Sequence, residues 1–304
     1  MAKKLKRISF TLLGIIAAIT LLIIGVRAYN DHVYGGEAYK FDAPAYFRDP
    51  ANLSLYPTNI NGVDVRRVDD GAVQGFHLVP REIKHKGTII VYGGSDGTPN
   101  YAQAVDFAKN GYEVLSLFMF GQKNQPKTLA RVPLEQFGQA LRYVETHAKS
   151  PSPLTVMGTS KGAEYALNLT SKYPQINNAI LAAPSAYNFN GLDFENYGSS
   201  WTWQGKELPY IDIQKTSFGH FIGDMIIPMI AKAPVTYKNA YQAAVDMDED
   251  NESKKIPLNT KANLLIIAGS DDQMWNSSSM GKSIKDRRPQ STDLAIYGGA
   301  GHVF

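Results

Sequence analysis

Residues 154–162 read Leu-Thr-Val-Met-Gly-Thr-Ser-Lys-Gly, and this stretch decides the fold. The apolar residues before Gly158 predict a buried strand, and the pattern of residues 163–169 predicts a helix directly after it. A serine between a strand and a helix sits on a tight turn, where a Cβ two residues away would collide with the neighbouring chain. Glycine is therefore needed at Gly158 and Gly162. The stretch has the form of a nucleophile elbow, which exposes Ser160 above the sheet.

The turn around the serine also predicts how a negatively charged oxygen would be held. Ser160 lies at the positive end of the following helix, where the backbone N–H of Lys161 is free to bind an oxyanion. The strand at 87–92 ends in paired glycines, and backbone N–H groups approach a substrate only where side chains are absent. Gly94 or Ser95 is therefore predicted as the second donor. The alternative is an ordinary strand-to-helix turn.

The rest of the chain alternates strand-like and helix-like segments. Apolar runs predict strands at 62–68, 73–79, 87–92, 112–118, 179–183, 262–268 and 294–297. Helical spacing of apolar residues predicts helices at 101–109 and 133–149. The first two strands form an expected antiparallel hairpin, and the others predict a mostly parallel sheet with right-handed crossovers. This organisation is that of an α/β-hydrolase fold over residues 61–304.

A hydrolase of this kind carries its acid and then its histidine after the serine. Two histidines follow Ser160 in the chain. His220 has no predicted strand just before it, whereas His302 follows the last strand on a loop whose glycines let it fold back over the serine. His302 is therefore predicted as the base, because an imidazole can take the serine proton and return it to the leaving group.

The acid is expected after the strand at 262–268, where the chain reads Ala-Gly-Ser-Asp-Asp over 268–272. The spacing from the glycine selects Asp272, whose carboxylate would orient His302. Asp271 is expected to cap the next helix or to hold the turn. Either aspartate alone is also a common turn residue after Gly-Ser.

Residues 185–257 interrupt the alternation and are rich in aromatic and apolar residues, among them Trp201, Trp203 and Phe221. Such a segment is too apolar for a surface loop and is expected to form a cap that shapes an apolar cleft over the serine. The alternative is a structural subdomain without substrate contact.

The N-terminus predicts a membrane segment. Residues 8–26 are 19 apolar or uncharged residues, which span roughly 28 Å as a helix and cover the hydrocarbon core of a bilayer. The preceding positive charges place the N-terminus in the cytoplasm and the rest of the chain outside. Residues 1–27 are therefore expected to be an uncleaved anchor and 28–60 a linker. The alternative is a signal peptide cleaved after Ala28, which would give a secreted protein.

Composition excludes several other classes of protein. Five of the 31 Lys and Arg residues lie within positions 1–27, which leaves 26 basic against 28 acidic residues in the remainder. No nucleic-acid partner is expected from this balance. The chain has no cysteine, so it holds no disulfide, no thiolate metal site and no cysteine nucleophile. The acidic run at 246–252 lacks the spacing of a calcium loop. We expect neither a metal nor a cofactor, and the sequence does not indicate an oligomeric state.

Several separate motifs resemble one known family. They are Ser-Lys-Gly-Ala-Glu at 160–164, Gln-Pro-Lys-Thr-Leu at 125–129, Gln-Gly-Lys-Glu-Leu-Pro at 204–209, Gly-Ser-Asp-Asp at 269–272 with Trp275, and Gly-Ala-Gly-His at 299–302. Over about residues 85–304 the chain resembles the C-terminal catalytic domain of acyl-CoA thioesterases and bile acid-CoA:amino acid N-acyltransferases. The resemblance implies an α/β-hydrolase domain with Ser160, Asp272 and His302 as its triad, acting on acyl thioesters or esters through an acyl-enzyme.

The chain departs from this family at several points. The residues before Gly62 are too few for the N-terminal β-sandwich of eukaryotic members, and the chain stops two residues after His302, where the fold normally adds a closing helix. The transferases of the family use cysteine, so Ser160 favours hydrolysis. Export would place the site where coenzyme A thioesters are scarce, which favours an ester substrate.

We therefore predict a single-pass membrane protein whose extracytoplasmic domain is a serine hydrolase of ester or thioester bonds. Two alternatives differ in their chemistry. One is an acyltransferase that moves the acyl group to an amine, and the other is a non-catalytic binding protein of the cell surface.

Overall fold

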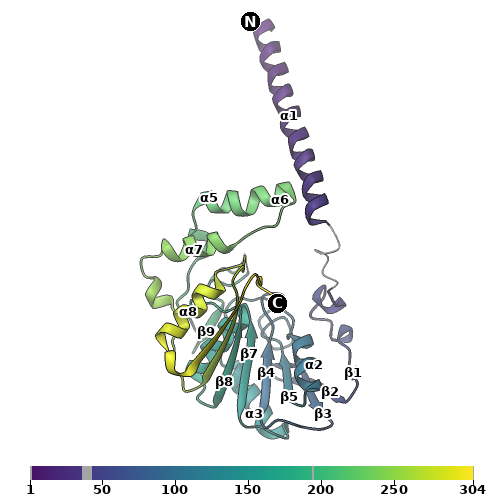
Figure 1. Ribbon diagram of the computed structural model, residues 1–304, viewed down its shortest axis with the longest axis vertical. Coiled ribbons are helices and arrows are strands. Elements are labelled where there is room, and N and C mark those ends of the chain that lie inside the picture. The colour runs from purple at the N-terminus through teal and green to yellow at the C-terminus, as the bar shows by residue number, and fades with distance from the viewer. Residues whose placement is uncertain (1, 36–42, 194, 304) are drawn as a thin grey trace.

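A nine-stranded sheet forms the centre of the molecule in a computed structural model that describes residues 2–35, 43–193 and 195–303 (Figure 1). Its order is β1-β2-β3-β5-β4-β7-β8-β11-β12. The strands are β1 (Asn59–Ile60), β2 (Val63–Asp70), β3 (Val73–Pro80), β4 (Thr88–Tyr92), β5 (Glu113–Leu117), β7 (Leu154–Thr159), β8 (Ile176–Ala182), β11 (Asn263–Gly269) and β12 (Thr292–Tyr297).

The pairing of these strands confirms the mostly parallel sheet. β2 and β3 form the predicted antiparallel hairpin, and β3 joins β5 antiparallel. From β5 to β12 every neighbouring pair is parallel. The carboxyl ends of these six strands therefore meet at one edge, and the loops that leave them are brought together there.

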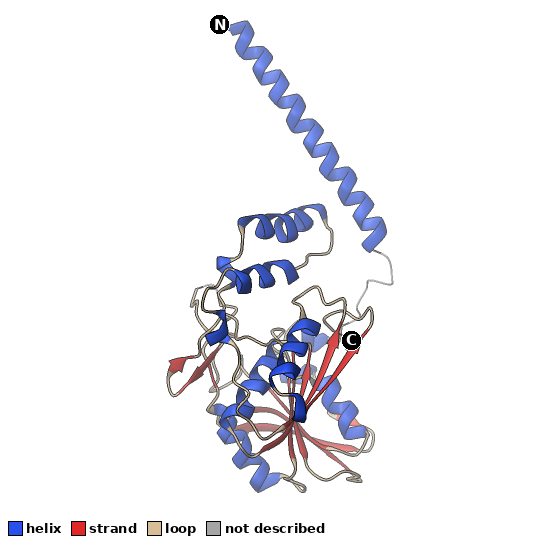
Figure 2. Ribbon diagram, turned by 60° about the vertical axis from the view of Figure 1, so that its left-hand side comes forward, coloured by secondary structure: helices blue, strands red, loops and turns tan. Residues whose placement is uncertain are grey.

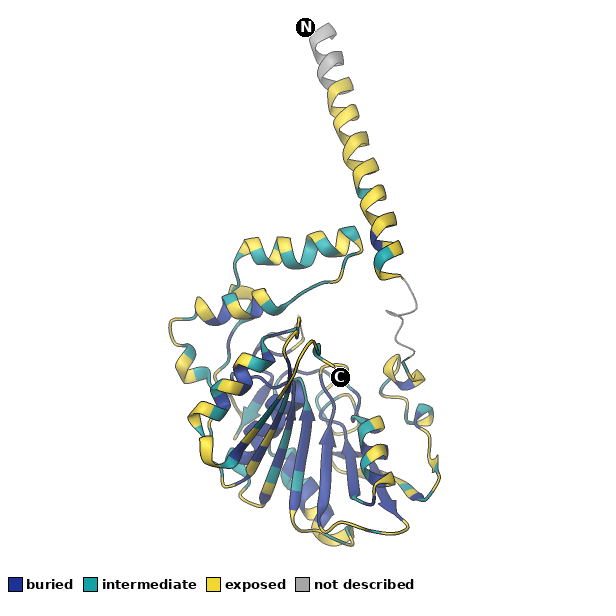
Figure 3. Cartoon of the chain, in the orientation of Figure 1, coloured by how far each residue is buried: buried dark blue, intermediate teal, exposed yellow. Residues whose placement is uncertain are grey.

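Helices cover both faces of the sheet. α2 (Tyr101–Lys109) contacts β3, β4 and β5 on one face, whereas α3 (Gln136–His147), α4 (Lys161–Lys172) and α8 (Ser277–Arg287) pack on the other. The buried strand residues alternate between two apolar clusters, one under each layer of helices. This alternation follows from the two-residue period of a strand. Figure 3 shows the central strands β4 and β5 as buried.

Residues 36–42 of the predicted linker 28–60 lie outside the described residues. Its later part contains two short helices, η2 (Ala45–Phe47) and η3 (Leu53–Leu55). Tyr46 and Tyr56 are buried there and stack with their ring centroids 4.5 Å apart, beside Tyr101 of α2. Residues 45–56 thus pack on the same face of the sheet as α2.

One helix in the described part of the chain is long and apolar enough to cross a membrane. α1 (Ala2–Tyr34) contains the candidate membrane span Phe10–Tyr34, within which an 18-residue window has a mean hydropathy of 2.3, and it extends away from the sheet (Figure 1). The helix continues seven residues past the predicted end of the anchor at residue 27.

The predicted cap leaves the sheet after β8 and returns at β11. Its first part pairs β9 (Trp201–Trp203) with β10 (Lys206–Glu207) and with β6 (Val132–Pro133) in a small second sheet. Its second part is helical, with η4 (Ile213–Lys215), α5 (Phe218–His220), η5 (Phe221–Ile226), α6 (Ile227–Ala231), α7 (Lys238–Asp246) and η6 (Asn251–Lys254). Figure 2 shows α5, α6 and α7 beyond the carboxyl ends of the strands.

Candidate active site

Ser160 occupies a strained turn between β7 and α4. Its backbone angles are φ 57° and ψ −120°, a conformation that residues other than glycine rarely adopt. A Cβ on Gly158 would lie 1.9 Å from the carbonyl oxygen of Gly162, and a Cβ on Gly162 would lie 2.0 Å from that of Gly93. The two glycines on either side of the serine are therefore required by space, as the sequence predicted.

His302 reaches Ser160 from the loop after β12. Its Nε2 lies 2.8 Å from Oγ of Ser160, and its Nδ1 lies 2.9 and 3.0 Å from the two carboxylate oxygens of Asp272. The loop is held against the acid-bearing turn, because the backbone N–H of Asp271 donates to the carbonyl of Ala300 at 2.9 Å. The structure thus brings Ser160, His302 and Asp272 into one hydrogen-bonded chain.

Asp272 is buried beneath the imidazole. Its Oδ1 also accepts hydrogen bonds from the backbone N–H groups of Met274 and Trp275, at 2.9 and 3.3 Å. Burial by itself raises the pKa of this carboxyl, but the hydrogen bonds from His302 and the backbone more than offset it and leave the pKa below its ordinary value. The indole of Trp275 stands edge-on to the imidazole, with ring centroids 5.2 Å apart. Asp272 is therefore an ionised acceptor in a fixed position.

The other candidates for acid and base lie elsewhere. The carboxylate of Asp271 accepts a hydrogen bond from the side chain of Gln273 at 2.6 Å and is exposed. His220 pairs through Nδ1 with Asp224 at 2.8 Å, within the helical part of the insertion. The hydrogen bonds of Ser160 and His302 therefore reach Asp272, whereas Asp271 and His220 have other partners.

The predicted oxyanion donors differ in their availability. Lys161 is the first residue of α4, so its N–H has no partner within the helix. Gly94 lies beside the nucleophile, since a Cβ on it would be 3.3 Å from Cβ of Ser160. However, the N–H of Gly94 already donates to Oδ1 of Asp96 at 3.0 Å. Of the two residues predicted for the second donor, Ser95 is the one whose N–H has no partner among the described residues.

The structure contains a buried ion pair beside the nucleophile that was not predicted from the sequence. Nζ of Lys161 lies 2.8 Å from Oε2 of Glu164, and neither side chain is more than 3% exposed. The other carboxylate oxygen of Glu164 accepts from Nε1 of Trp201 at 2.7 Å and from the N–H of Phe189 at 3.0 Å. Burial raises the pKa of Glu164 and lowers the pKa of Lys161, while the charge of each partner opposes that shift. Glu164 thus connects the nucleophile helix to the start of the insertion.

The signal for this pair is present in the sequence. Glu164 stands three residues after Lys161, which is the spacing of neighbours on one helix face. However, burial of both charges depends on contacts with Phe189 and Trp201, far along the chain. The helical pattern of residues 160–164 does not predict these contacts.

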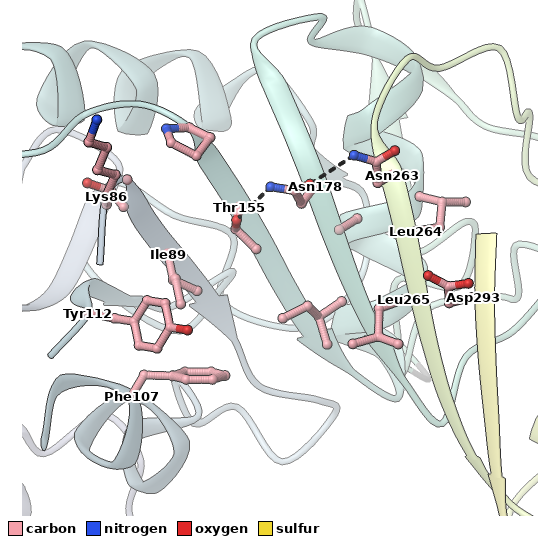
Figure 4. A pocket seen from close by; sticks show the side chains of 15 residues that line it. Lys86, Ile89, Phe107, Tyr112, Thr155, Asn178, Asn263, Leu264, Leu265 and Asp293 are labelled. Atoms are coloured by element: carbon pink, nitrogen blue, oxygen red, sulfur yellow. Dashed lines mark hydrogen bonds between the residues drawn. The ribbon is translucent and has the colours of Figure 1, made fainter. Parts of the chain in front are cut away.

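A cavity of about 300 Å³ lies away from this chemistry. It is lined by residues at the amino-terminal ends of strands, including Thr155, Asn178 and Asn263, which are joined by hydrogen bonds of 3.2 and 3.3 Å (Figure 4). Ser160 and His302 lie at the opposite edge of the sheet. Within the described ranges, three or more His, Asp or Glu side chains nowhere gather as they would around a metal ion.

Residues 132–304 match the protein family described as BAAT / acyl-CoA thioester hydrolase C terminal. The chain belongs to this family. Membership confirms the resemblance that the motifs around Ser160 and His302 indicated.

Curated relatives of the family include both hydrolases and transferases. Human acyl-coenzyme A thioesterase 1 is 25% identical over 224 residues, which cover 71% of this chain and 47% of that protein. Mouse acyl-coenzyme A amino acid N-acyltransferase 1 is 26% identical over 251 residues, covering 80% and 54%. The chain spans about half the length of these relatives.

Solved structures confirm the α/β-hydrolase fold. An esterase of Pyrococcus furiosus aligns with a TM-score of 0.50 at 15% identity, covering 79% of this chain and 83% of that one. An esterase/lipase from an uncultured bacterium aligns with a TM-score of 0.50 at 14% identity, covering 92% and 89%. At these identities the likeness concerns the fold alone.

Proposed function

We propose that this chain is a serine hydrolase that cleaves ester or thioester bonds through an acyl-enzyme. The observation that carries the proposal is the hydrogen-bonded chain from Ser160 through His302 to Asp272. Membership of a family that contains acyl-CoA thioesterases supports the same chemistry.

Acylation begins with attack of Oγ of Ser160 on the acyl carbon. Nε2 of His302 takes the serine proton as the new bond forms, and the carbonyl oxygen becomes an oxyanion. The oxyanion collapses, the bond to the leaving alcohol or thiol breaks, and Nε2 returns the proton to that leaving group. In the second half, water attacks the acyl-serine with the same proton transfers and releases the carboxylic acid.

Asp272 fixes the tautomer that this sequence of steps needs. With a proton on Nδ1 of His302 donated to the ionised carboxylate of Asp272, Nε2 is left without a proton and accepts from the serine hydroxyl. The carboxylate also stabilises the imidazolium that forms during attack.

Two backbone N–H groups are proposed to hold the oxyanion. One belongs to Lys161 at the start of α4, where the helix dipole also favours negative charge. The other is assigned to Ser95 in preference to Gly94, whose N–H is occupied by Asp96. Each such donor contributes on the order of 10²–10³ in rate in comparable enzymes.

Hydrolysis is favoured over transfer to an amine because the chain has serine where transferases of this family use cysteine. The transferase alternative is retained because mouse relatives carry that activity in their names. We also propose that α1 anchors the domain outside the cytoplasm, because basic residues precede its apolar stretch. An ester is then a more accessible substrate than a coenzyme A thioester.

Labelling with a fluorophosphonate tests the proposed nucleophile. The full chain is expected to be labelled at Ser160 and to release acid from a panel of esters of graded acyl length. Folded Ser160→Ala protein that is still labelled would overturn the assignment. Adding glycine or taurine to the same assay separates the alternatives, because a transferase passes the acyl group to the amine faster than to water.

A further inference from the structure

The helical segment Phe218–Ala231, formed by α5, η5 and α6, is apolar but uncovered. Among its residues none is buried, and five large apolar side chains are strongly exposed. These are Phe218 (78%), Phe221 (42%), Ile227 (56%), Met229 (60%) and Ile230 (50%). Scattered apolar residues on a surface are ordinary, but a short helix that is almost wholly apolar needs an apolar surface against it.

The two polar side chains of this segment are partly exposed, His220 at 43% and Asp224 at 23%, and Asp224 contacts α7. Nδ1 of His220 lies 2.8 Å from Oδ2 of Asp224, and the same oxygen accepts from the side chain of Asn239 in α7 at 3.3 Å. Two sides of the segment therefore differ, since the side that contacts α7 carries Asp224 while the five large apolar side chains are exposed to solvent. This division is that of a helix lying on a membrane surface.

The end of the segment is fixed to α1. The side-chain amide of Asn30 donates to the carbonyl of Ala231 at 2.7 Å, and Nζ of Lys232 lies 2.6 Å from Asp31. Asn30 is only 8% exposed, so this contact is enclosed. In Figures 1 and 2 the segment lies to one side of the lower end of α1, with its axis at a steep angle to that helix.

The depth of this contact matches a bilayer interface. Asp31 lies five residues beyond the apolar run that ends at Val26, which is about 7.5 Å along a helix. The headgroup region on each side of the hydrocarbon core has a similar thickness, and interfacial helices insert about 5–10 Å into it. A helix tied to Asn30 and Asp31 therefore meets the interface if residues 8–26 cross the bilayer.

We propose that Phe218–Ala231 lies in the lipid interface of the bilayer that α1 crosses, as a second membrane contact. The occupant of its apolar surface is the phospholipid leaflet at which α1 ends. This proposal rests on the anchoring of α1 put forward above and not on the chemistry of Ser160.

The proposed membrane contact also sets the orientation of the active site relative to the bilayer. After Lys232 the chain returns to the triad, where the N–H groups of Tyr237 and Lys238 donate to the carbonyl of Gln273, next to Asp272. The segment and the catalytic edge of the sheet thus face the same side of the molecule (Figure 2). The substrate class that fits this arrangement is an ester whose acyl chain partitions into the bilayer.

The absence of cysteine permits a direct test in the full chain. Single cysteines replace Ile227, Met229 or Ile230, carry an environment-sensitive fluorophore, and are studied in phosphatidylcholine vesicles with or without nitroxide-labelled lipid. Leu21→Cys reports the membrane position of α1. Glu145→Cys, at an exposed position of α3, is the aqueous control. Circular dichroism shows that each variant is folded.

We expect blue-shifted emission and several-fold stronger quenching at all three segment positions than at residue 145. Quenching at residue 21 but not at residues 227, 229 and 230 would overturn the proposal while leaving the anchor intact. Absence of quenching at residue 21 would overturn the anchor and the proposal together. Fluorophore self-quenching between copies, without quenching by lipid, would overturn it in favour of a protein–protein interface. Labelling of Ser160 is measured separately, so failure of the proposed chemistry is distinguishable from each of these.

Discussion

Oγ of Ser160 and Nε2 of His302 lie 2.8 Å apart although 142 positions separate the two residues. Their strands, β7 and β12, are not neighbours, since β8 and β11 lie between them. The loop after β12 must therefore cross the carboxyl ends of two strands to reach the serine. It does so by packing against Gly269, where a Cβ would lie 2.2 Å from the carbonyls of Ala300 and Gly301.

If the two side chains act as one unit, their removal is not additive. Ser160→Ala and His302→Ala are each expected to lower kcat on the order of 10⁴–10⁶, and the double variant should be no slower than the slower single variant. Steady-state hydrolysis of a short ester measures all three. A double variant slower by the product of the two single effects would mean that the residues act independently.

The assignment of the acid predicts a large difference between adjacent residues. Asp272→Asn keeps the shape of the side chain but loses the charge that fixes the tautomer of His302, so a loss of about 10⁴ in kcat is expected. Asp271→Asn is the matched control, because Asp271 contacts Gln273 and not the imidazole. Equal losses in the two variants would remove Asp272 from its proposed role.

Order along the chain made this site predictable. Ser160, Asp272 and His302 each follow a strand, and the carboxyl ends of parallel strands converge whatever the length of the connections. The elbow around Ser160 was also predictable. The turn leaves no space for a Cβ at positions 158 and 162, and the glycines at both positions are visible in the sequence.

Contacts across the insertion were not predictable in the same way. The aromatic residues of 185–257 suggested a cleft lining, yet Trp201 is fully buried and donates to Glu164. Likewise, Asn30 and Ala231 are 201 positions apart and meet only because the insertion folds back toward α1. No short sequence pattern predicts either contact. Each contact depends on the path of the long insertion, whose residues do not follow the regular alternation of strands and helices.

The buried pair of Lys161 and Glu164 predicts an asymmetry in stability. Glu164→Gln leaves the ammonium of Lys161 buried without an anion, which is expected to cost about 3–5 kcal/mol. Adding Lys161→Met removes that charge, and the glutamine side chain of the double variant still offers a carbonyl oxygen to Trp201 and Phe189. The double variant should therefore be more stable than Glu164→Gln alone. Chemical denaturation followed by circular dichroism measures this, and a double variant no more stable than Glu164→Gln would contradict it.

A second buried carboxylate predicts how stability depends on pH. Glu113 accepts hydrogen bonds from His77 at 2.9 Å and from the backbone N–H groups of Lys149 and Ser150 at 2.9 and 2.8 Å. Burial raises the pKa of Glu113, but these hydrogen bonds outweigh it and leave the pKa below its ordinary value.

Because the folded pKa of Glu113 is lower than the unfolded one, the unfolded chain binds the proton first as the pH falls. The carboxylate therefore stabilises the fold fully above the unfolded pKa of about 4.3, and this contribution is lost as the pH falls toward the folded pKa. Glu113→Gln should be less stable than the wild type at pH 7, and the difference in Tm should narrow between pH 5 and pH 3. Glu145→Gln, on the exposed side of α3, is the control and should match the wild type throughout. A difference in Tm between Glu113→Gln and the wild type that stays constant across that range would show that the negative charge of Glu113 does not stabilise the fold.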